Sequence, residues 1–394
     1  MNPLDGIRVV DFTHAISGPT CTQLLRQLGA EIVKIEPPGT GDAFRHYTEH
    51  AGLPGMSIPF AAINAGKKSV TLDLKSAEGK AIALRLAERA DIVIENFRPG
   101  VIARLGLGYA EVKAVNPRIL FLSLSGFGQT GPLRDWGAYD HIAQAVSGMA
   151  MMNANESGPQ KIGMPVVDSF AGYLAAIALL AALRKRDSTG IGEYLDVAML
   201  DAALKLIATG VSVNDYTGEA PSGTGNRGYR LVATAEFYPT ADGWIALGAN
   251  HQHQIEGLFR AFGHAEMIED ARFRDHQGRV DHYDALKAWL MSYLADRRAE
   301  DVEAVLTAAG VPAAMIRDVG QISVHPHMVQ RGLLQQAILP GSDRPLTVVG
   351  AGFDVEPEPA PPIVPTLGAD SETVLAGLGY DAANVAELRA KGVV

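Results

Sequence analysis

The sequence has a single cysteine, Cys21, among its 394 residues. One thiol excludes an intrachain disulfide, and it excludes a metal site built from several cysteines. Cys21 falls within an expected buried helix, where a core side chain is favoured over a reactive nucleophile. Disulfide scaffolds and cysteine-ligated metals are therefore removed from consideration.

Several motifs of catalysis and binding are also missing. No G-x-G-x-x-G joins the first expected strand to the following helix, so NAD binding is disfavoured. No G-x-S-x-G is present, and Ser125-Gly126 does not fit that pattern, which disfavours a serine hydrolase. The close histidine pairs, His251–His253 and His325–His327, have no third ligand nearby in the sequence. No metal site is predicted.

Long apolar segments are scarce. The run Phe170–Leu183 is shorter than the roughly 20 residues that a membrane span needs, so it predicts a fully buried core helix. The first residues, Met-Asn-Pro-Leu-Asp-Gly, lack the basic and apolar segments of a secretory signal. These features predict a cytoplasmic protein without a membrane partner.

Positive charge is in short supply as well. The formal net charge is -10, with 34 Lys and Arg against 44 Asp and Glu, so nucleic-acid binding is disfavoured. An anionic ligand needs a local basic patch, and cations do gather near the ends of the N-terminal strands: Lys67, Lys68, Lys75, Arg98 and Arg104. This set suits a phosphorylated ligand, and it equally suits a solvated surface.

The apolar segments that are present predict an α/β fold. Strands are expected near 7–12, 31–35, 69–74, 91–95, 118–125 and 193–197, with helices between them, as in a doubly wound parallel sheet. Residues 1–215 form the large domain in this interpretation. A Gly-, Ser-, Pro- and Thr-rich linker at 216–232 separates it from a small α+β domain at 233–325.

The stretch from Gly163 to Arg186 holds the most suggestive carboxylate. Pro165 favours an extended lead-in, and the Ala- and Leu-rich residues from Ser169 favour a helix. Asp168 therefore stands where the helix begins, and its carboxylate is expected to accept the N–H groups of the first turn. Composition alone favours a helix cap over a catalytic group at this position.

A glycine-rich loop, Gly126–Pro132, follows the expected strand 118–125. Such a loop allows the backbone to approach a ligand, and it is equally compatible with a tight turn. Gly126 and Gly128 are candidate N–H donors to an oxyanion.

Taken in order, several motifs resemble the family III CoA-transferases, the formyl-CoA and carnitine CoA-transferase (CaiB/BaiF) family. They are Asp11–His14 with Gly18-Pro19, Lys34–Glu36, Asn64–Ser69, Leu72–Lys75, Glu95–Gly100, Ser125–Pro132, Ala138–Asp140, the Asp168 helix and Thr189–Asp196. Each motif is weak by itself, but the ordered series spans nearly the whole chain.

The resemblance implies a Rossmann-like large domain built from both chain ends, so that residues 326–394 return to it, plus a smaller α+β domain. It also implies a ring-shaped monomer in an interlocked homodimer. The catalytic aspartate of the family falls on Asp168. The family's CoA contacts fall on His14, Ile16, Ser17, Leu72, Asp73, Leu74, Lys75, Asn96, Phe97, Arg98, Arg104, Ala138 and Tyr139. CoA thioesters are the expected substrates, and no permanently bound cofactor is expected.

Two departures from the family pattern bear on substrate recognition. Pro37 occupies the position after Lys-x-Glu where some members carry an arginine that contacts the nucleotide end of CoA. The glycine run of formyl-CoA transferases is also reduced here to Gly223–Gly228, which disfavours that specificity.

The expected reaction moves CoA from an acyl-CoA donor, succinyl-CoA or acetyl-CoA, to a small dicarboxylic acid through aspartyl anhydride and aspartyl-CoA intermediates. Arg45 and Arg227 are candidates to pair with the distal carboxylate, and a solvated surface is the alternative for each. A 2-methylacyl-CoA racemase on the same fold is the competing function. Because Ala138-Tyr139-Asp140 replaces the Gly-His-Asp of such racemases, that alternative is disfavoured. A third alternative is a CoA-binding protein without catalysis, in which Asp168 only caps its helix.

Overall fold

The computed structural model describes residues 2–48, 53, 55–223, 225–227, 231–355 and 360–394. The chain forms two compact units. Unit 1 comprises Met1–Ala150, Lys161–Pro221 and Val329–Val394, and unit 2 comprises Met151–Gln160 and Ser222–Met328.

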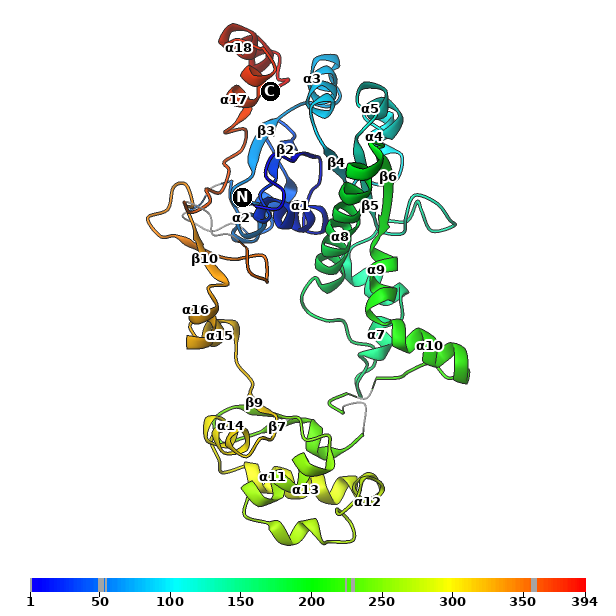
Figure 1. Cartoon of the computed structure of the whole chain (residues 1–394), viewed down its shortest axis with the longest axis vertical. Helices are drawn as coiled ribbons and strands as arrows, with labels where there is room; N and C mark the ends of the chain where they lie inside the picture. Colours follow the sequence, from blue (N-terminus) through cyan, green and yellow to red (C-terminus); the bar gives the residue numbers. More distant parts are fainter. Residues whose placement is uncertain (1, 49–52, 54, 224, 228–230, 356–359) are drawn as a thin grey trace. The chain divides into compact units, whose positions relative to one another are not determined.

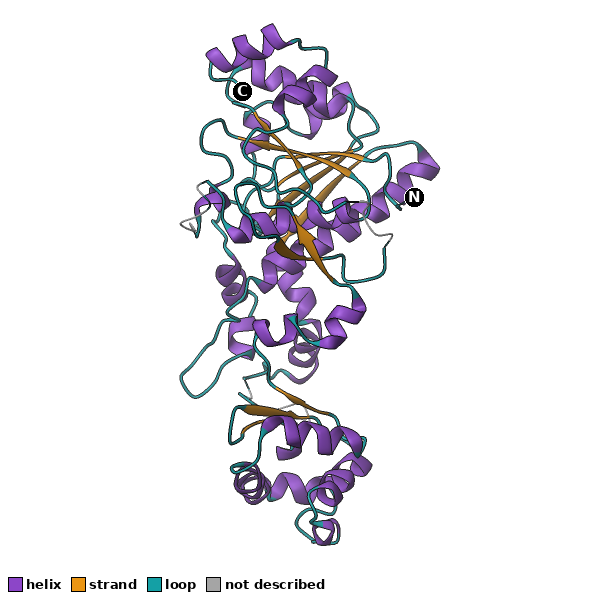
Figure 2. Cartoon of the chain, turned by 90° about the vertical axis from the view of Figure 1, so that its left-hand side faces the viewer, coloured by secondary structure: helices purple, strands orange, loops and turns teal. Residues whose placement is uncertain are grey.

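The centre of unit 1 is a six-stranded sheet in the order β3-β2-β1-β4-β5-β6. Every neighbouring pair is parallel. The strands are β1 Arg8–Asp11, β2 Glu31–Glu36, β3 Lys68–Thr71, β4 Ile92–Glu95, β5 Leu120–Ser125 and β6 Glu193–Ala198. The predicted α/β class and parallel sheet are confirmed, and Figure 2 shows the strands between helices on both sides.

Alternating apolar residues explain why both faces of this sheet are covered. Val9 faces one core with Ile92 and Ile94, whereas Val10 faces the other with Val93. The first core is closed by α1 (Ser17–Gln27) and α8 (Val166–Thr189), and the second by α3 (Ala77–Glu88), α5 (Tyr109–Val115) and the C-terminal helices. Continuous apolar strands of this kind are typical of parallel sheets buried on both faces.

The C-terminal segment completes unit 1. Helix α17 (Ser371–Gly377) contacts β3, and α18 (Ala382–Ala390) follows it, as the red helices in Figure 1 show. The N–H of Asp73 donates to the carbonyl of Val393 at 2.8 Å, and the N–H of Ser69 donates to the Asp370 carboxylate at 2.9 Å. Both ends of the sequence therefore contribute to one hydrophobic core.

Shorter elements fill the rest of unit 1: η1 Ala43–His46, α2 Ile58–Asn64, α4 Val101–Arg104, α6 Asp140–Val146, α9 Met199–Leu206, α10 Ala208–Thr217, and the antiparallel pair β10 Leu334–Ala337 and β11 Leu346–Val349. Helices α7, Met149–Met152, and α16, Pro326–Arg331, each cross the boundary between the two units.

Unit 2 packs helices against a three-stranded antiparallel sheet. Its elements are η2 Ala233–Ala235, β7 Phe237–Pro239, β8 Trp244–Leu247, α11 Gln252–Ala261, η3 Ala265–Ile268, α12 His276–Asp281, α13 Tyr283–Leu294, α14 Ala299–Ala308, β9 Ala313–Met315 and α15 Val319–Ser323. The hairpin of β7 and β8 and the helices α11, α13 and α14 give this unit a mixed α and β composition.

The division into units differs from the predicted boundaries at two segments. Residues 326–328 and Met151–Gln160 belong to unit 2, although both were predicted to be part of the large domain. For Met151–Gln160 the physical reason is close packing: a Cβ atom added at Gly223 would lie only 2.1 Å from the Ala154 carbonyl oxygen. Residues 224 and 228–230 of the predicted linker and glycine segment lie outside the described residues.

Helix α8 departs from the fully buried helix that was predicted. It buries Val167, Ala171, Ala175 and further residues of the same stripe, but Ile177 on another face is 59% exposed. With 24 residues and a mean hydropathy of 2.0 over an 18-residue window, α8 is long and apolar enough to cross a membrane by those criteria alone. Core helices of globular domains pass the same test, and the buried stripe of α8 packs on α1 and the sheet.

Candidate active site

The sheet reverses its winding direction between β1 and β4, which places a crevice at the carboxyl ends of these strands. Two residues join the strands there. The N–H of His14 donates to Asn96 Oδ1 at 2.8 Å, and Asn96 Nδ2 donates to the His14 carbonyl at 2.8 Å. The rings of His14 and Phe97 lie 5.3 Å apart. Two of the predicted CoA-contact segments thus meet at the crevice.

A cavity of about 330 Å³ opens beside this pair. Six predicted CoA contacts line it: His14, Leu72, Asp73, Leu74, Lys75 and Phe97. Pro37, Pro38, Val101 and Leu105 complete its apolar wall. An apolar pocket with a few polar groups at its edge suits a flat heteroaromatic ring.

The turn after β4 is shaped by a buried carboxyl group. Glu95 accepts the N–H of Phe97 at 2.8 Å, which turns the chain toward the cavity. Burial raises the pKa of Glu95 to about 7, with a smaller contribution from the charge of Asp196. Hydrogen bonds from Ser123 and from the Phe97 N–H act in the opposite direction.

Three of the predicted cations remain exposed near the carboxyl ends of the strands. Lys75 lines the cavity, Arg98 lies against Gly137, and Arg104 folds back beside Gly100. Arg98 therefore joins the segment after β4 to the one that carries Ala138 and Tyr139. Exposed cations around an apolar cavity suit the phosphates of a nucleotide.

The structure corrects the assignment of the other two cations. Lys67 is buried, and its Nζ donates to the Pro19 carbonyl, Thr22 and Asn64 at 2.8–3.0 Å. Burial lowers the pKa of Lys67 to about 7, against the opposing attraction of nearby carboxylates. Lys68 begins β3, at the opposite end of the sheet from the crevice, where it pairs with Glu31 at 2.6 Å. Neither lysine can bind a ligand in the crevice.

Asp168 lies in the first turn of α8, but it is not the cap. The helix begins after Pro165, which makes Asp168 the third helical residue. The N–H of Val167 instead donates to the Asp140 carboxylate at 3.2–3.3 Å. Gln144 bridges the segments by donating to Asp140 and accepting the N–H of Ile162 at 2.8 Å. A carboxylate from α6 therefore caps α8 and leaves Asp168 for other contacts.

The electrostatics of Asp168 also differ from the prediction. A helix N-terminus was expected to keep this carboxylate ionised by lowering its pKa. Burial and the neighbouring Asp140 charge instead raise the pKa of Asp168 to about 6, although a hydrogen bond from Ser17 lowers it in part. Asp168 is thus a poorly solvated carboxylate that still ionises near neutral pH.

Close packing of two helices brings Ser17 to Asp168. Ser17 begins α1, and Gly172 lies one turn after Asp168 on α8. A Cβ atom added at Gly172 would lie 2.4 Å from the Ser17 carbonyl oxygen. Glycine is required for this approach, and residues four apart on a helix share a face. The contact therefore positions Asp168 beside the loop that follows β1.

A sequence model of CoA-transferase family III matches residues 4–371. The chain belongs to CoA-transferase family III. The succinyl-CoA–D-citramalate CoA-transferase of Chloroflexus aurantiacus is 37% identical over 335 residues, covering 84% of this chain and 82% of that protein. The acetyl-CoA:oxalate CoA-transferase of Acetobacter aceti is 36% identical, covering 93% and 94%.

A solved structure gives the same result. The crystal structure of a CaiB/BaiF family protein from Brucella suis superposes with a TM-score of 0.87 at 30% identity, covering 96% of this chain and all of that one (100%). These findings identify a transferase that moves CoA between an acyl-CoA and a carboxylic acid.

In this family III CoA-transferase, the glycine-rich loop contributes packing as well as backbone. A Cβ atom added at Gly126 would lie 2.1 Å from Ala138 Cβ, so glycine lets the Ala138–Tyr139 segment approach β5. The Gly128 N–H donates to Ser125 Oγ at 3.0 Å. Gly128 is therefore withdrawn as an oxyanion donor, because its N–H already has a partner within the loop.

The two arginines considered for the distal carboxylate of a substrate have other contacts. Arg45 is buried and donates two hydrogen bonds of 2.7 Å to Glu36, so it cannot pair with the distal carboxylate of a substrate. Arg227, in unit 2, stacks over the Tyr283 ring at 3.5 Å. The structure thus assigns Arg45 to the interior of unit 1.

The role of Asp140 and part of the cavity wall were not predicted from the sequence. Asp140 belongs to the Ala138–Asp140 motif, but its hydrogen bond to α8 joins segments far apart in the sequence and has no local signal. Pro38, Val101 and Leu105 were missed because apolar residues predict burial without indicating which cavity they line.

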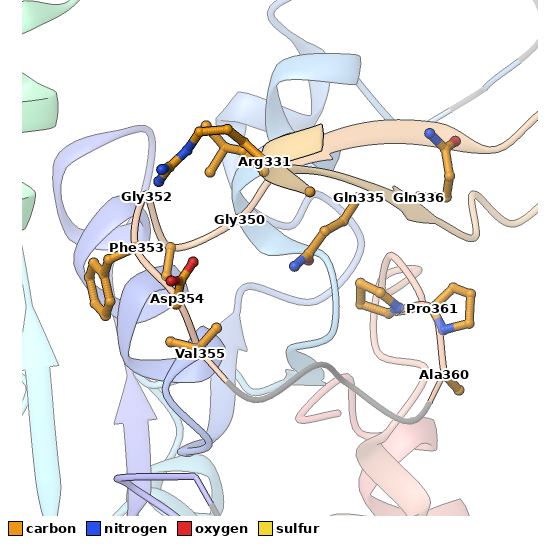
Figure 3. A pocket seen from close by; sticks show the side chains of 14 residues that line it. Arg331, Gln335, Gln336, Gly350, Gly352, Phe353, Asp354, Val355, Ala360 and Pro361 are labelled. Atoms are coloured by element: carbon orange, nitrogen blue, oxygen red, sulfur yellow. The ribbon is translucent and has the colours of Figure 1, made fainter. Parts of the chain in front are cut away.

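Another cavity, of about 540 Å³, lies in the C-terminal part of unit 1 (Figure 3). Gln335 and Gln336 lie on one side of it, and Phe353 and Asp354 on the other. None of the predicted catalytic or CoA-contact residues lines this cavity. Six of the predicted CoA-contact residues line the cavity at the crevice between β1 and β4 instead.

Proposed function

We propose that this protein transfers CoA from succinyl-CoA or acetyl-CoA to a small dicarboxylic acid, with Asp168 as the nucleophile. One observation carries the proposal. Asp168 is a partly buried carboxylate whose pKa is raised to about 6 by its low solvation, and Ser17, at the start of the helix after β1, donates a hydrogen bond to it. The loop between β1 and that helix carries His14, which lines the cavity expected to bind CoA.

In the first half-reaction, Asp168 attacks the thioester carbonyl and expels the CoA thiolate, forming a mixed anhydride with the donor acyl group. The thiolate then attacks the aspartyl carbonyl, which forms an aspartyl-CoA thioester and releases the donor acid. A pKa of about 6 leaves Asp168 mostly ionised at pH 7, by roughly ten to one. Its low solvation leaves the carboxylate more reactive than one in water.

In the second half-reaction, the acceptor carboxylate attacks the aspartyl-CoA carbonyl and expels the thiolate again. The thiolate then attacks the acyl carbonyl of the acceptor in this second anhydride, releasing the new acyl-CoA and restoring Asp168. Each intermediate conserves the energy of the thioester provided that water is excluded. Asp168, the CoA thiolate and the acceptor carboxylate are the nucleophiles, so the scheme requires no permanently bound cofactor.

The cavity beside His14 is the proposed binding site for the nucleotide end of CoA. Its apolar wall suits the adenine ring, and Lys75, Arg98 and Arg104 suit the phosphates. Pro37 lines the cavity where some relatives are expected to use arginine. Apolar contact with Pro37 and Pro38 replaces that charged contact in this proposal.

Catalysis by Asp168 is tested by replacing it. Asp168→Asn and Asp168→Ala are expected to abolish transfer, because an amide or a methyl group cannot form the anhydride. Hydroxylamine should trap an aspartyl-CoA intermediate in the parent protein and none in either variant. Transfer at the parent rate by Asp168→Ala would refute the proposal. A non-catalytic CoA-binding protein would give no trapped intermediate in any form.

The substrates are proposed from the named relatives. The similar proteins act on D-citramalate or oxalate with succinyl-CoA or acetyl-CoA, respectively. A panel of donors and free acids, analysed by mass spectrometry, would identify the pair. Preference for a monocarboxylic acceptor over every dicarboxylic acid tested would contradict the proposed class.

We further propose a cytoplasmic, interlocked homodimer of ring-shaped chains. Exposed apolar side chains on α8–α10 support an interface: Tyr173, Ile177, Leu204, Leu206, Val211, Val213 and Tyr216. Sedimentation equilibrium should give twice the mass of the 41.8 kDa chain. A monomer at micromolar concentration would contradict the dimer.

Racemisation of a 2-methylacyl-CoA is the competing activity, and no feature of the site favours it. Tyr139 is 68% exposed, and Asp140 is engaged with α8. Incorporation of deuterium at C2 of an acyl-CoA, without transfer to an added acid, would establish racemisation instead.

A further inference from the structure

The loop between β1 and α1 is fixed by the side chains of three residues, Asp11 at the end of β1 and the more distant Asn96 and Asp42. The N–H of Thr13 donates to Asp11 at 2.8 Å, that of His14 to Asn96 at 2.8 Å, and that of Ala15 to Asp42 at 3.2–3.3 Å. Three successive backbone donors thus have side-chain acceptors. Asp42 is the partner of the last of them, two residues before Ser17.

Ala15 adopts a conformation that alanine disfavours. Its φ is +62°, in the left-handed region, and only one other described non-glycine residue has a positive φ. The methyl group of an L-residue crowds the backbone there, so the conformation persists only if surrounding contacts enforce it. The hydrogen bond from the Ala15 N–H to Asp42 is the contact that enforces it at this residue.

Asp42 is itself held rigidly. It is completely buried, and its carboxylate lies 3.0 Å from Lys34 Nζ. The same Nζ donates to the Thr13 carbonyl at 2.6 Å, so Lys34 clamps the other end of the loop. The Asp42 carboxylate also accepts the N–H of Phe44, and the Asp42 N–H donates to Glu36, each at 2.9 Å. The Asp42–Lys34 pair therefore holds the loop through two hydrogen bonds, one to the Thr13 carbonyl and one from the Ala15 N–H.

The direction of the chain after Ala15 determines where Ser17 lies. The next turn is tight, because a Cβ atom added at Gly18 would lie 2.2 Å from Thr13 Cβ. If Ala15 relaxed to a negative φ, the chain between Thr13 and Gly18 would leave in another direction. The Ser17 hydroxyl would then withdraw from Asp168.

We propose that Asp42 is a positioning residue for the transfer reaction: by holding Ala15 in the left-handed conformation, it places the Ser17 hydroxyl against Asp168. This inference rests on the proposed role of Asp168 as the nucleophile. Asp42 itself touches no substrate in this scheme and acts through the backbone of the loop.

Replacing Asp42 alone would be ambiguous, because it removes the carboxylate paired with the buried Lys34 and can prevent folding. Ala15 avoids this difficulty, because its side chain is only half-buried and makes none of these polar contacts. Ala15→Val makes a positive φ much less favourable, whereas Ala15→Gly makes it easy. The two variants bracket the parent, and neither replaces a polar side chain.

Ala15→Val is expected to lower kcat about 10- to 100-fold, the scale of a misplacement of about 1 Å at a reacting group. KM for the acyl-CoA donor should change less than about threefold, because Asn96 still holds His14 and the cavity wall is unaltered. Ala15→Gly should keep kcat within about threefold of the parent. Asp42→Asn should lower kcat, and Ala15→Gly added to it should restore kcat at least in part.

Parent kcat in Ala15→Val, a rise in KM without a fall in kcat, or no rescue of a folded Asp42→Asn protein by Ala15→Gly would each overturn the inference. Asp168→Ala is measured alongside. If Asp168→Ala retains transfer, the proposed function fails; if Asp168→Ala is inactive while Ala15→Val is unaffected, only the positioning role fails.

Discussion

The raised pKa of Asp168 predicts that removing its charge stabilises the protein. Its pKa is about 6 against an ordinary value of 3.8, mainly because burial and then the Asp140 charge disfavour the ionised form. A difference of about 2 units corresponds to about 3 kcal/mol of the free energy of unfolding. The ionised nucleophile therefore destabilises the folded state by about that amount at pH 7.

The direction of this pKa shift determines how the free energy of unfolding changes with pH. The folded state binds this proton more tightly than the unfolded state, so the parent protein loses stability as the pH rises from 3.8 to about 6. Above that range the full cost is present. Asp168→Asn has no such titration, so its advantage of up to about 3 kcal/mol at pH 7.5 should shrink steadily as the pH falls toward 4.

Differential scanning calorimetry at several pH values tests this prediction, because it can separate the transitions of the two units. A gain in Tm of a few degrees is expected for the transition of unit 1 at pH 7.5. Asp284→Asn is a matched control, since Asp284 is an exposed aspartate in the first turn of α13 in unit 2. It should destabilise slightly through loss of a favourable helix-dipole contact. Equal or lower stability of Asp168→Asn at pH 7.5, or a gain independent of pH, would refute the reasoning.

Three further predictions concern the same site. Asp140→Asn should move the acid limb of the kcat/KM profile from near pH 6 to lower pH, because it removes the negative charge next to Asp168. The asparagine still offers an acceptor for the Val167 N–H. An unmoved limb would contradict this prediction. Phe97→Ala should raise KM for acyl-CoA about tenfold, the equivalent of about 1.4 kcal/mol, with little change in kcat, as steady-state kinetics would show. Gly172→Ala should lower both Tm and kcat, because the new methyl group would meet the Ser17 carbonyl at 2.4 Å; Gly377→Ala, where nothing lies within 4 Å, is the control expected to leave both nearly unchanged.

The sheet could be predicted from the sequence because its signal is local. Most strands of the six-stranded sheet are short, largely apolar segments bounded by turn residues, and burial on both faces follows from the alternation of Val9 and Val10 and their counterparts. Short helices such as α2 and α5 were missed, because seven residues carry too little periodicity to be distinguished from a loop.

The site was predictable as a set of residues but not as a set of contacts. The ordered motifs placed His14, Leu72–Lys75 and Phe97 together, and they do line one cavity. Sequence could not show that Lys67 turns inward to the Pro19 carbonyl, or that Asp140 rather than Asp168 caps α8. Both outcomes depend on which distant segment lies nearby, and charge and composition contain no such information.

The return of the C-terminal segment to unit 1 has a consequence for biosynthesis. Strand β3 is covered by the C-terminal helices α17 and α18, and the hydrogen bond from the Asp73 N–H to the Val393 carbonyl can form only after Val393 has been synthesised. Contacts of such high contact order form slowly, because the intervening chain must first be brought into place. Until the C-terminal helices have been synthesised, the β3 side of one sheet face therefore stays uncovered and prone to aggregation, which makes the nascent chain a natural substrate for chaperones.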